Sequence, residues 1–320
     1  MNPREQKVLL SGVKPTGRPH IGNYFGAMRQ FVELQNTGSY ENFFFVANYH
    51  ALTTQRDPKE LLQNTYDIVV DYLAIGLDPE RSTIYIQSDV PEVTELAWIF
   101  NCLVTVPFLA RAHAYKDALA KSSEPNAGLF TYPVLMAADI LLPGADIVPV
   151  GKDQKQHVEY ARDIAEKFNN AYGETFKLPE AMVLENVAVV PGTDGQKMSK
   201  SYGNTISLFA DRSEIEKAVM GVVTDSSGDF PKNVHALHAL FKPEQEFATL
   251  YEANKGNYKI LKEALIEDMD AFLAPLRTRR AEIAKDPDTV RAIVKNGGEK
   301  AREHAMVKMR EIRQKIGLVQ

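Results

Sequence analysis

The first 170 residues alternate between short apolar runs and longer amphipathic runs, and this alternation restricts the possible folds more than any other feature. Continuous or alternating apolar runs predict strands at residues 7–12, 42–47 (NFFFVA), 82–87 (STIYIQ) and 147–150. Helical periodicity fills the intervals, at residues 20–35, 58–75, 91–105 and 153–169. Strands that alternate with helices favour a parallel sheet with helices on its faces.

The strand-like pattern ends near residue 211. Long amphipathic patterns follow at residues 261–276 and 290–316, with Pro275, Pro287 and the pair Gly297–Gly298 as expected interruptions. We therefore expect two domains, an α/β domain over residues 1–205 and an α-helical domain over residues 206–320.

Composition excludes several classes of protein. A hydrophobic fraction of 44% and a charged fraction of 25% are those of an ordinary globular chain. The single cysteine, Cys102, excludes a disulfide framework and leaves too few thiolates for a zinc knuckle or an iron–sulfur cluster. No apolar run approaches the length of a membrane span, and the first residues lack the apolar core of a signal peptide. These features predict a cytoplasmic protein without a membrane partner.

Charge is unevenly distributed along the chain. The formal net charge is −5, yet residues 277–320 hold 12 lysines and arginines against 6 acidic residues, a net of +6, which leaves −11 for the remainder. A protein polarised in this way can present a basic face to an anionic partner.

The earliest chemical signal is SGVKPTGRPHIGNYFGAM, residues 11–28, between a predicted strand and a predicted helix. An α/β sheet opens its ligand crevice at this kind of junction, and unpaired N–H groups at a helix start favour phosphate. Gly22 would let a nucleotide approach closely, while His20 and Asn23 could donate to phosphate oxygens. A simple helix-capping turn explains the HIGN tetrapeptide about as well.

A second signal is GQKMSKSYGN, residues 195–204, where two lysines lie among serines and glycines. Taken alone, such a cluster is typical of a solvated surface loop. A third is Asp139 within VLMAADILL, because a carboxylate in apolar sequence needs a partner. It is either a buried acid satisfied by the protein itself or part of a binding site, and Met136, one helical turn earlier, is either core or a contact for an aromatic ligand.

Taken together, these motifs resemble those of a known family. The pattern P-x-G-x-P-H-I-G-N, followed about 175 residues later by K-M-S-K-S, resembles the two signatures of class I aminoacyl-tRNA synthetases. Between them, TYPVLMAADILL (131–142) and VPVGKDQKQHVEYARDIA (148–165) resemble the bacterial-type tryptophanyl-tRNA synthetases, and the resemblance extends over essentially the whole chain. The related tyrosyl enzymes share both signatures and are the alternative.

The resemblance implies a Rossmann-like nucleotide-binding domain, followed by a helical domain that engages the tRNA anticodon region. It implies catalytic roles for Lys197, Lys200, His20 and Lys116. We call residues 195–204 the lysine loop. In the family this loop closes over ATP, so that its lysines neutralise the charge that develops as pyrophosphate leaves. The positions that would contact ATP are Lys14, Pro15, Thr16, Gly22, Asn23, Gly151, Lys152, Asp153, Val189, Lys197, Met198, Ser199, Lys200 and Ser201.

For the amino acid, the resemblance implies that Asp139 accepts the indole N–H of tryptophan, a group that only donates. Met136 would pack on the ring, Tyr132 and Gln154 would hold the ammonium group, and His50 would line the pocket. Two positions depart from the family pattern, which often has aspartate where this chain has Asn48 and glutamine where it has Lys14. His157 is either a site residue or a structural histidine.

The expected substrates are ATP, with Mg²⁺ carried mainly by the phosphates, L-tryptophan and tRNA(Trp), and the family implies a homodimer. Arg277, Arg279 and Arg280 are the expected tRNA contacts, with a solvated helix face as the alternative. The last helix could instead fold back on the α/β domain and pair its charges there. A non-catalytic RNA-binding relative is a further alternative, which the lysines at 197 and 200 disfavour.

Overall fold

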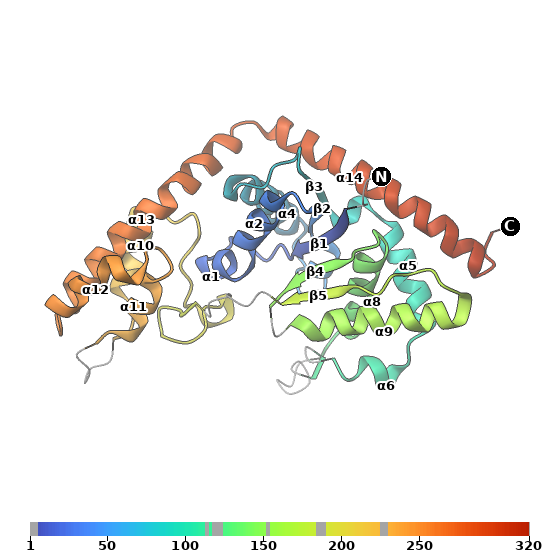
Figure 1. The fold of residues 1–320 in the computed structure, drawn as a ribbon, viewed down its shortest axis with the longest axis horizontal. Coiled ribbons are helices and arrows are strands. Elements are labelled where there is room, and N and C mark those ends of the chain that lie inside the picture. The colour runs from blue at the N-terminus through green and yellow to red at the C-terminus, as the bar shows by residue number, and fades with distance from the viewer. Residues whose placement is uncertain are drawn as a thin grey trace.

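A computed structural model describes residues 6–112, 115–116, 124–151, 154–183, 190–224 and 230–319. At its centre lies a five-stranded parallel sheet in the order β3-β2-β1-β4-β5 (Figure 1). The strands are β1 (Lys7–Val13), β2 (Tyr40–Val46), β3 (Ser82–Ile86), β4 (Ile147–Val150) and β5 (Glu180–Val183). This order, with helical crossovers, is that of a Rossmann-like doubly wound sheet, so the α/β prediction is confirmed.

Helices follow each strand of the first half. After β1 come α1 (Ile21–Asn23), the π-helical η1 (Tyr24–Met28) and α2 (Arg29–Thr37), which together form the predicted helix. After β2 come α3 (Asn48–Ala51) and α4 (Pro58–Ile75). After β3 come η2 (Gln87–Asp89), α5 (Glu92–Asn101), α6 (Val106–Leu109) and α8 (Ala127–Leu141), and after β4 comes α9 (Lys155–Tyr172). The sequence sets the ends of α4 locally: Asp57 caps its first amides, and Gly76 ends it at a φ of 114°.

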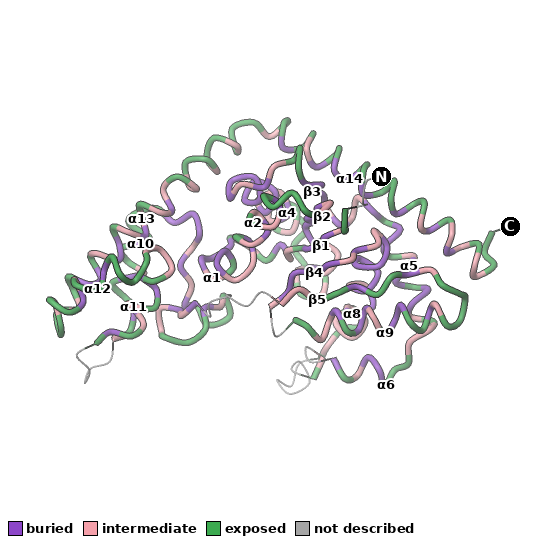
Figure 2. The backbone as a smooth tube through the Cα atoms, viewed as in Figure 1, coloured by how far each residue is buried: buried purple, intermediate pink, exposed green. Residues whose placement is uncertain are grey.

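Two apolar cores lie on opposite faces of the sheet. Side chains alternate between them along β2, where Phe44 and Val46 face one core and Phe43 and Phe45 face the other. Helices α2 and α4 cover the first face, and α5, α8 and α9 cover the second. Buried residues therefore concentrate along the strands and the inner sides of these helices (Figure 2).

The second half is helical, with a 3₁₀ turn η4 (Lys200–Tyr202), then α10 (Arg212–Met220), α11 (Lys232–His238), α12 (Glu244–Ala253), α13 (Tyr258–Ile283) and α14 (Pro287–Lys315). Two of the three expected helix interruptions are wrong. Pro275 lies inside α13, and Gly297 and Gly298 lie inside α14. The third is confirmed, because Pro287 opens α14 at its first position, behind the cap formed by Asp286.

Helix α14 returns along the sheet and contacts β3 and α5 (Figure 1). Gly297 lies against the backbone carbonyl of Ile84, so closely that a Cβ atom there would overlap it. Further along α14, Arg302 pairs with Glu92 at 2.9 Å and Arg313 donates to both carboxylate oxygens of Glu95. Basic residues of the last helix thus pair with acidic residues of the first half. Within the described ranges, no helix is long and apolar enough to span a bilayer.

Candidate active site

A cavity of about 510 Å³ opens at the carboxyl edge of the sheet. The ends of β1, β2 and β4 contribute Lys14, Ala47 and Gly151 to its wall, and α8 contributes a second wall. Ligands of doubly wound sheets bind at this edge, because the loops that follow parallel strands converge there. The polar side chains expected to bind the amino acid are all part of its lining: His50, Tyr132, Asp139 and Gln154. His157, whose role was left open, also lines it.

Asp139 lies in this wall, and only 4% of its surface is exposed. Its Oδ2 is 2.9 Å from His50 Nε2, and the amide nitrogen of Gln87 donates to both carboxylate oxygens at 2.8 Å. Two neighbours therefore hold the carboxylate in one orientation, with its oxygens as acceptors at the cavity wall.

Gln87 is a site residue that the motifs did not reveal. Its side chain is almost fully buried, and its Oε1 accepts the backbone N–H of Tyr49 at 2.9 Å while its nitrogen holds Asp139. One signal was available: Gln87 is the last residue of the third predicted strand, at the edge of the sheet where ligands bind.

Tyr132 and Met136 also lie on α8, on the turns preceding Asp139. The hydroxyl of Tyr132 is 2.6 Å from Nε2 of His157, which comes from the neighbouring helix α9. His157 therefore lines the cavity and contacts Tyr132, an expected site residue. Met136 and the ring of Tyr132, one helical turn apart, give this wall an apolar surface beside the buried carboxylate of Asp139.

The HIGN turn begins the helix after β1. His20 Nδ1 accepts the backbone N–H of Asn23, and the side chain of Asn23 accepts the backbone N–H of His20. Burial, reinforced by the charge of Lys200, lowers the pKa of His20 to about 4, so the ring is neutral at physiological pH. Gly22 is required here by His20 itself, since a Cβ atom would lie 2.8 Å from Nδ1.

The lysine loop lies against this turn. Lys200 Nζ donates to the carbonyls of Thr16 at 2.8 Å and Gly17 at 2.9 Å, so it sits directly beside the HIGN segment. Met198 is buried, whereas Lys197 is exposed. Asn204 is a second residue that the motifs left without a role. Its buried side chain accepts from the backbone of Ser199 at 2.8 Å and donates to Asp194 at 2.7 Å, which fixes the base of the loop.

Both departures from the family pattern have local partners. Lys14 lines the cavity and donates to the hydroxyls of Thr53 at 2.9 Å and Thr54 at 3.3 Å, and burial lowers its pKa. Asn48 exchanges hydrogen bonds with Ser88: its amide donates to the hydroxyl at 2.8 Å and its oxygen accepts the backbone N–H at 3.1 Å. The asparagine thus joins the loops after β2 and β3.

Other expected site residues lie elsewhere. Lys116 is exposed and is not part of the cavity lining. Lys152, Asp153 and Val189 lie outside the described residues. In the described part of the chain, no group of three or more histidines, cysteines and acids could hold a metal ion.

The three arginines at the end of α13 differ from one another. Arg277 donates to the carbonyl of Ala210 at 2.5 Å and to Asp270 at 2.9 Å, and Arg280 pairs with Asp71 and Asp67. Both guanidinium groups thus have partners within the protein, and their contact with tRNA stays a prediction. Arg279 is exposed, with no hydrogen bond or ion pair to another described residue, and it keeps the expected role.

Comparison with known proteins is consistent with this geometry. The family described as "tRNA synthetases class I (W and Y)" matches residues 1–277. A tryptophan–tRNA ligase of Fusobacterium nucleatum is 49% identical over 98% of both chains, and one of Rhodopirellula baltica is 47% identical over 97% of this chain and 99% of that one. A crystal structure of a tryptophanyl-tRNA synthetase from Campylobacter jejuni, complexed with ADP and tryptophan, is 45% identical with a TM-score of 0.89, covering 97% of this chain and 99% of the other.

Proposed function

We propose that this chain, which belongs to the class I tRNA synthetases for tryptophan and tyrosine, is a tryptophan–tRNA ligase. The observation that carries the proposal is Asp139, a buried carboxylate whose oxygens are held as acceptors at the wall of a 510 Å³ cavity. The indole N–H of tryptophan is a donor only, and it complements such an acceptor. Met136 and the ring of Tyr132 would flank the indole.

The reaction has two steps. The tryptophan carboxylate attacks the α-phosphorus of ATP, which forms tryptophanyl-adenylate and releases pyrophosphate. A ribose hydroxyl at the 3′ end of tRNA(Trp) then takes the aminoacyl group and releases AMP. The protein supplies position and charge: the HIGN turn would bind ATP, and Lys197 and Lys200 would stabilise the negative charge on the leaving pyrophosphate. Mg²⁺ would enter with ATP and stay mainly on its phosphates.

The remaining sites follow the same assignment. The ATP positions would be Lys14, Gly22, Asn23, Gly151 and residues 197–201. Tyr132 and Gln154 would bind the tryptophan ammonium, and His50 would hold Asp139. Lys116 stays a prediction, since its side chain is exposed and away from the cavity lining.

The tyrosyl enzyme is the alternative, and amino-acid-dependent exchange of pyrophosphate into ATP separates the two. The full-length protein is assayed with each of the twenty amino acids. We expect exchange with tryptophan to exceed that with tyrosine or phenylalanine by several orders of magnitude. Exchange supported mainly by tyrosine would assign the chain to the alternative, and no exchange with any amino acid would refute an activating enzyme.

We also propose a cytoplasmic homodimer. The resemblance implies a dimer, and Trp98 and Val106 expose 71% and 69% of their surfaces on the neighbouring elements α5 and α6. Large exposed apolar side chains of this kind favour association with a second copy. Sedimentation of wild-type protein and of Trp98→Ser tests this. A wild-type protein that sediments as a monomer at micromolar concentration refutes the dimer.

A further inference from the structure

The chain that leaves the lysine loop runs directly beside the HIGN turn. We call residues 206–210 the exit segment. Ile21 donates its backbone N–H to Ile206 at 3.0 Å, and Leu208 donates to the carbonyl of Pro19 at 3.0 Å. His20 and Ser207 form the antiparallel bridge between these bonds. The HIGN turn is thus joined by backbone hydrogen bonds to the segment that follows the lysine loop, and we expect a displacement of the exit segment to shift both motifs.

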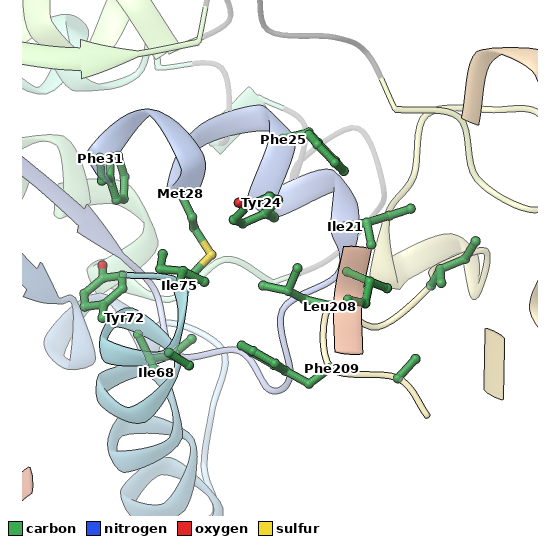
Figure 3. Close-up of a cluster of buried hydrophobic side chains, with 14 of the residues drawn as sticks. Ile21, Tyr24, Phe25, Met28, Phe31, Ile68, Tyr72, Ile75, Leu208 and Phe209 are labelled. Atoms are coloured by element: carbon green, nitrogen blue, oxygen red, sulfur yellow. The ribbon is translucent and has the colours of Figure 1, made fainter. Parts of the chain in front are cut away.

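The exit segment is also packed between helices. Leu208 and Phe209 are buried, and Figure 3 shows them between Ile21, at the start of α1, and Ile68 of α4. Phe209 accepts a hydrogen bond on its carbonyl from Arg18, 3.4 Å away. The position of the lysine loop therefore depends on what holds this segment from its other side.

Helix α13 contacts the exit segment from its other side. Arg277 donates to the carbonyl of Ala210 at 2.5 Å, and the guanidinium of Arg280 lies over the ring of Phe209 at 5.3 Å from its centroid. Arg280 also donates through Nε to Asp71 at 2.5 Å and through Nη2 to Asp67 at 3.0 Å. A single side chain of α13 thus contacts both α4 and the exit segment.

The pair with Asp71 is buried. Only 1% of the Asp71 side chain is exposed, and its second oxygen has no hydrogen-bond partner among the described residues. A buried carboxylate with one strong partner depends on that partner, since loss of the partner leaves a charge in an apolar surrounding. Arg280 is therefore bound to one position, and so is the phenylalanine ring beneath it.

We propose that Arg280 is a positioning residue for adenylate formation, which fixes the exit segment, and with it the lysine loop, through Asp71 and Phe209. The inference rests on the function proposed above. It gives Arg280 a role in the chemistry of ATP, where the sequence suggested a contact with tRNA. Electrostatics agree with this placement: burial lowers the pKa of Lys200, and the negative charge of Asp71 partly opposes that lowering.

The test is pyrophosphate exchange without tRNA, with Arg280→Gln as the variant. Misplacement of catalytic groups by about 1 Å can cost about 100-fold, so we expect kcat to fall about 10- to 100-fold with the KM for tryptophan unchanged. Lys285→Gln, an exposed position just beyond the end of α13, is the matched control and should exchange at the wild-type rate. Wild-type kcat in Arg280→Gln overturns the inference, as does an equal change in the control.

A double-mutant comparison shows whether Arg280 acts through the lysine loop. In a Lys200→Ala background, Arg280→Gln should lower the exchange rate by a smaller factor than in wild-type protein, because one of the groups it positions is already gone. The full single-mutant factor in that background overturns the inference.

Stability is controlled separately. If Arg280→Gln does not fold, the same measurements are made on Asp71→Asn/Arg280→Gln, which leaves no buried unpaired charge. A folded double variant with wild-type kcat likewise contradicts the inference. Wild-type protein that fails to exchange contradicts instead the function on which it rests.

Discussion

At the scale of single residues, the role proposed for Asp139 is to determine which amino acid the cavity accepts. Its oxygens are held by Gln87 and His50, so the acceptors are already oriented when a ligand enters. A site built to bond an N–H group rejects analogues that lack it by up to about 10⁴–10⁵-fold, because its polar group is then left unpaired. Removal of the carboxylate removes this penalty.

We therefore expect Asp139→Ala to reduce the preference for tryptophan over phenylalanine. The measurement is kcat/KM for each amino acid in pyrophosphate exchange. Met136→Leu, which keeps an apolar side chain of similar volume one turn away, serves as the control and should keep the preference. An unchanged preference in Asp139→Ala would remove this carboxylate from amino-acid recognition.

Lys200 is expected to act mainly in the transition state. Its ammonium group lies on the carbonyls of Thr16 and Gly17, outside the cavity lined by Asp139. Lys200→Ala should slow adenylate formation about 10²- to 10³-fold, the usual cost of one preorganised donor. Tryptophan binding, measured by equilibrium dialysis, should be nearly unchanged. Equal losses in binding and in rate would contradict a transition-state role.

The sequence predicted the residues that line the site better than it predicted the side chains that those residues contact. Asp139, Tyr132, Met136, Gln154 and His50 were predicted together, and all five line one cavity. Gln87 was not predicted, because a lone glutamine after a strand carries no motif. The partners of Arg277 and Arg280 within the protein were not predicted, because a count of charges cannot reveal that Asp270, Asp67 and Asp71 lie within reach of them.

At the scale of elements, the sequence predicted those strands whose residues form a continuous apolar run. Strand β5 was not predicted, since Glu180–Val183 is short and only partly buried. Pro275 did not end α13, and Gly297 did not end α14, because tertiary packing outweighed local preference. The absence of a side chain at Gly297 is what allows α14 to lie against β3.

Gly297→Ala therefore has two opposed effects. Alanine favours a helix over glycine by about 1 kcal/mol, but its Cβ atom would overlap the backbone of Ile84, which cannot move aside as a side chain can. Overpacking of this kind costs about 1–3 kcal/mol, so we expect a net loss of unfolding free energy in urea titrations. Asn296→Ala, exposed on the same helix, should be neutral or slightly stabilising. Equal stability of both variants would contradict close packing of α14 on β3.

At the scale of the whole molecule, several basic residues of the positively charged C-terminal segment form ion pairs within the protein. Arg302, Arg313 and Lys300 of α14 pair with Glu92, Glu95 and Glu41 of the acidic first half. Basic residues that are paired in this way contribute less to an anion-binding surface. The net charge of a segment therefore predicts a partner only when the pairing of its residues is known.

Of the three expected tRNA contacts, Arg279 is the one with no ion pair to another described residue. Arg279→Gln should weaken tRNA(Trp) binding and flatten the dependence of log K on log salt by at most about 0.9, the value for one duplex phosphate contact. Filter binding across a salt series measures this, with tRNA-free exchange as the control for integrity. An unchanged salt slope would place Arg279 outside the tRNA interface.

The return of α14 along β3 has a consequence for how the protein is made. β3 is an edge strand of its sheet, and an uncovered edge strand invites pairing with other chains. The helix that lies against it comes from residues 287–315, which leave the ribosome long after β3. Until this helix emerges, the nascent chain carries a sheet with β3 exposed, so the growing polypeptide is vulnerable to aggregation throughout that interval.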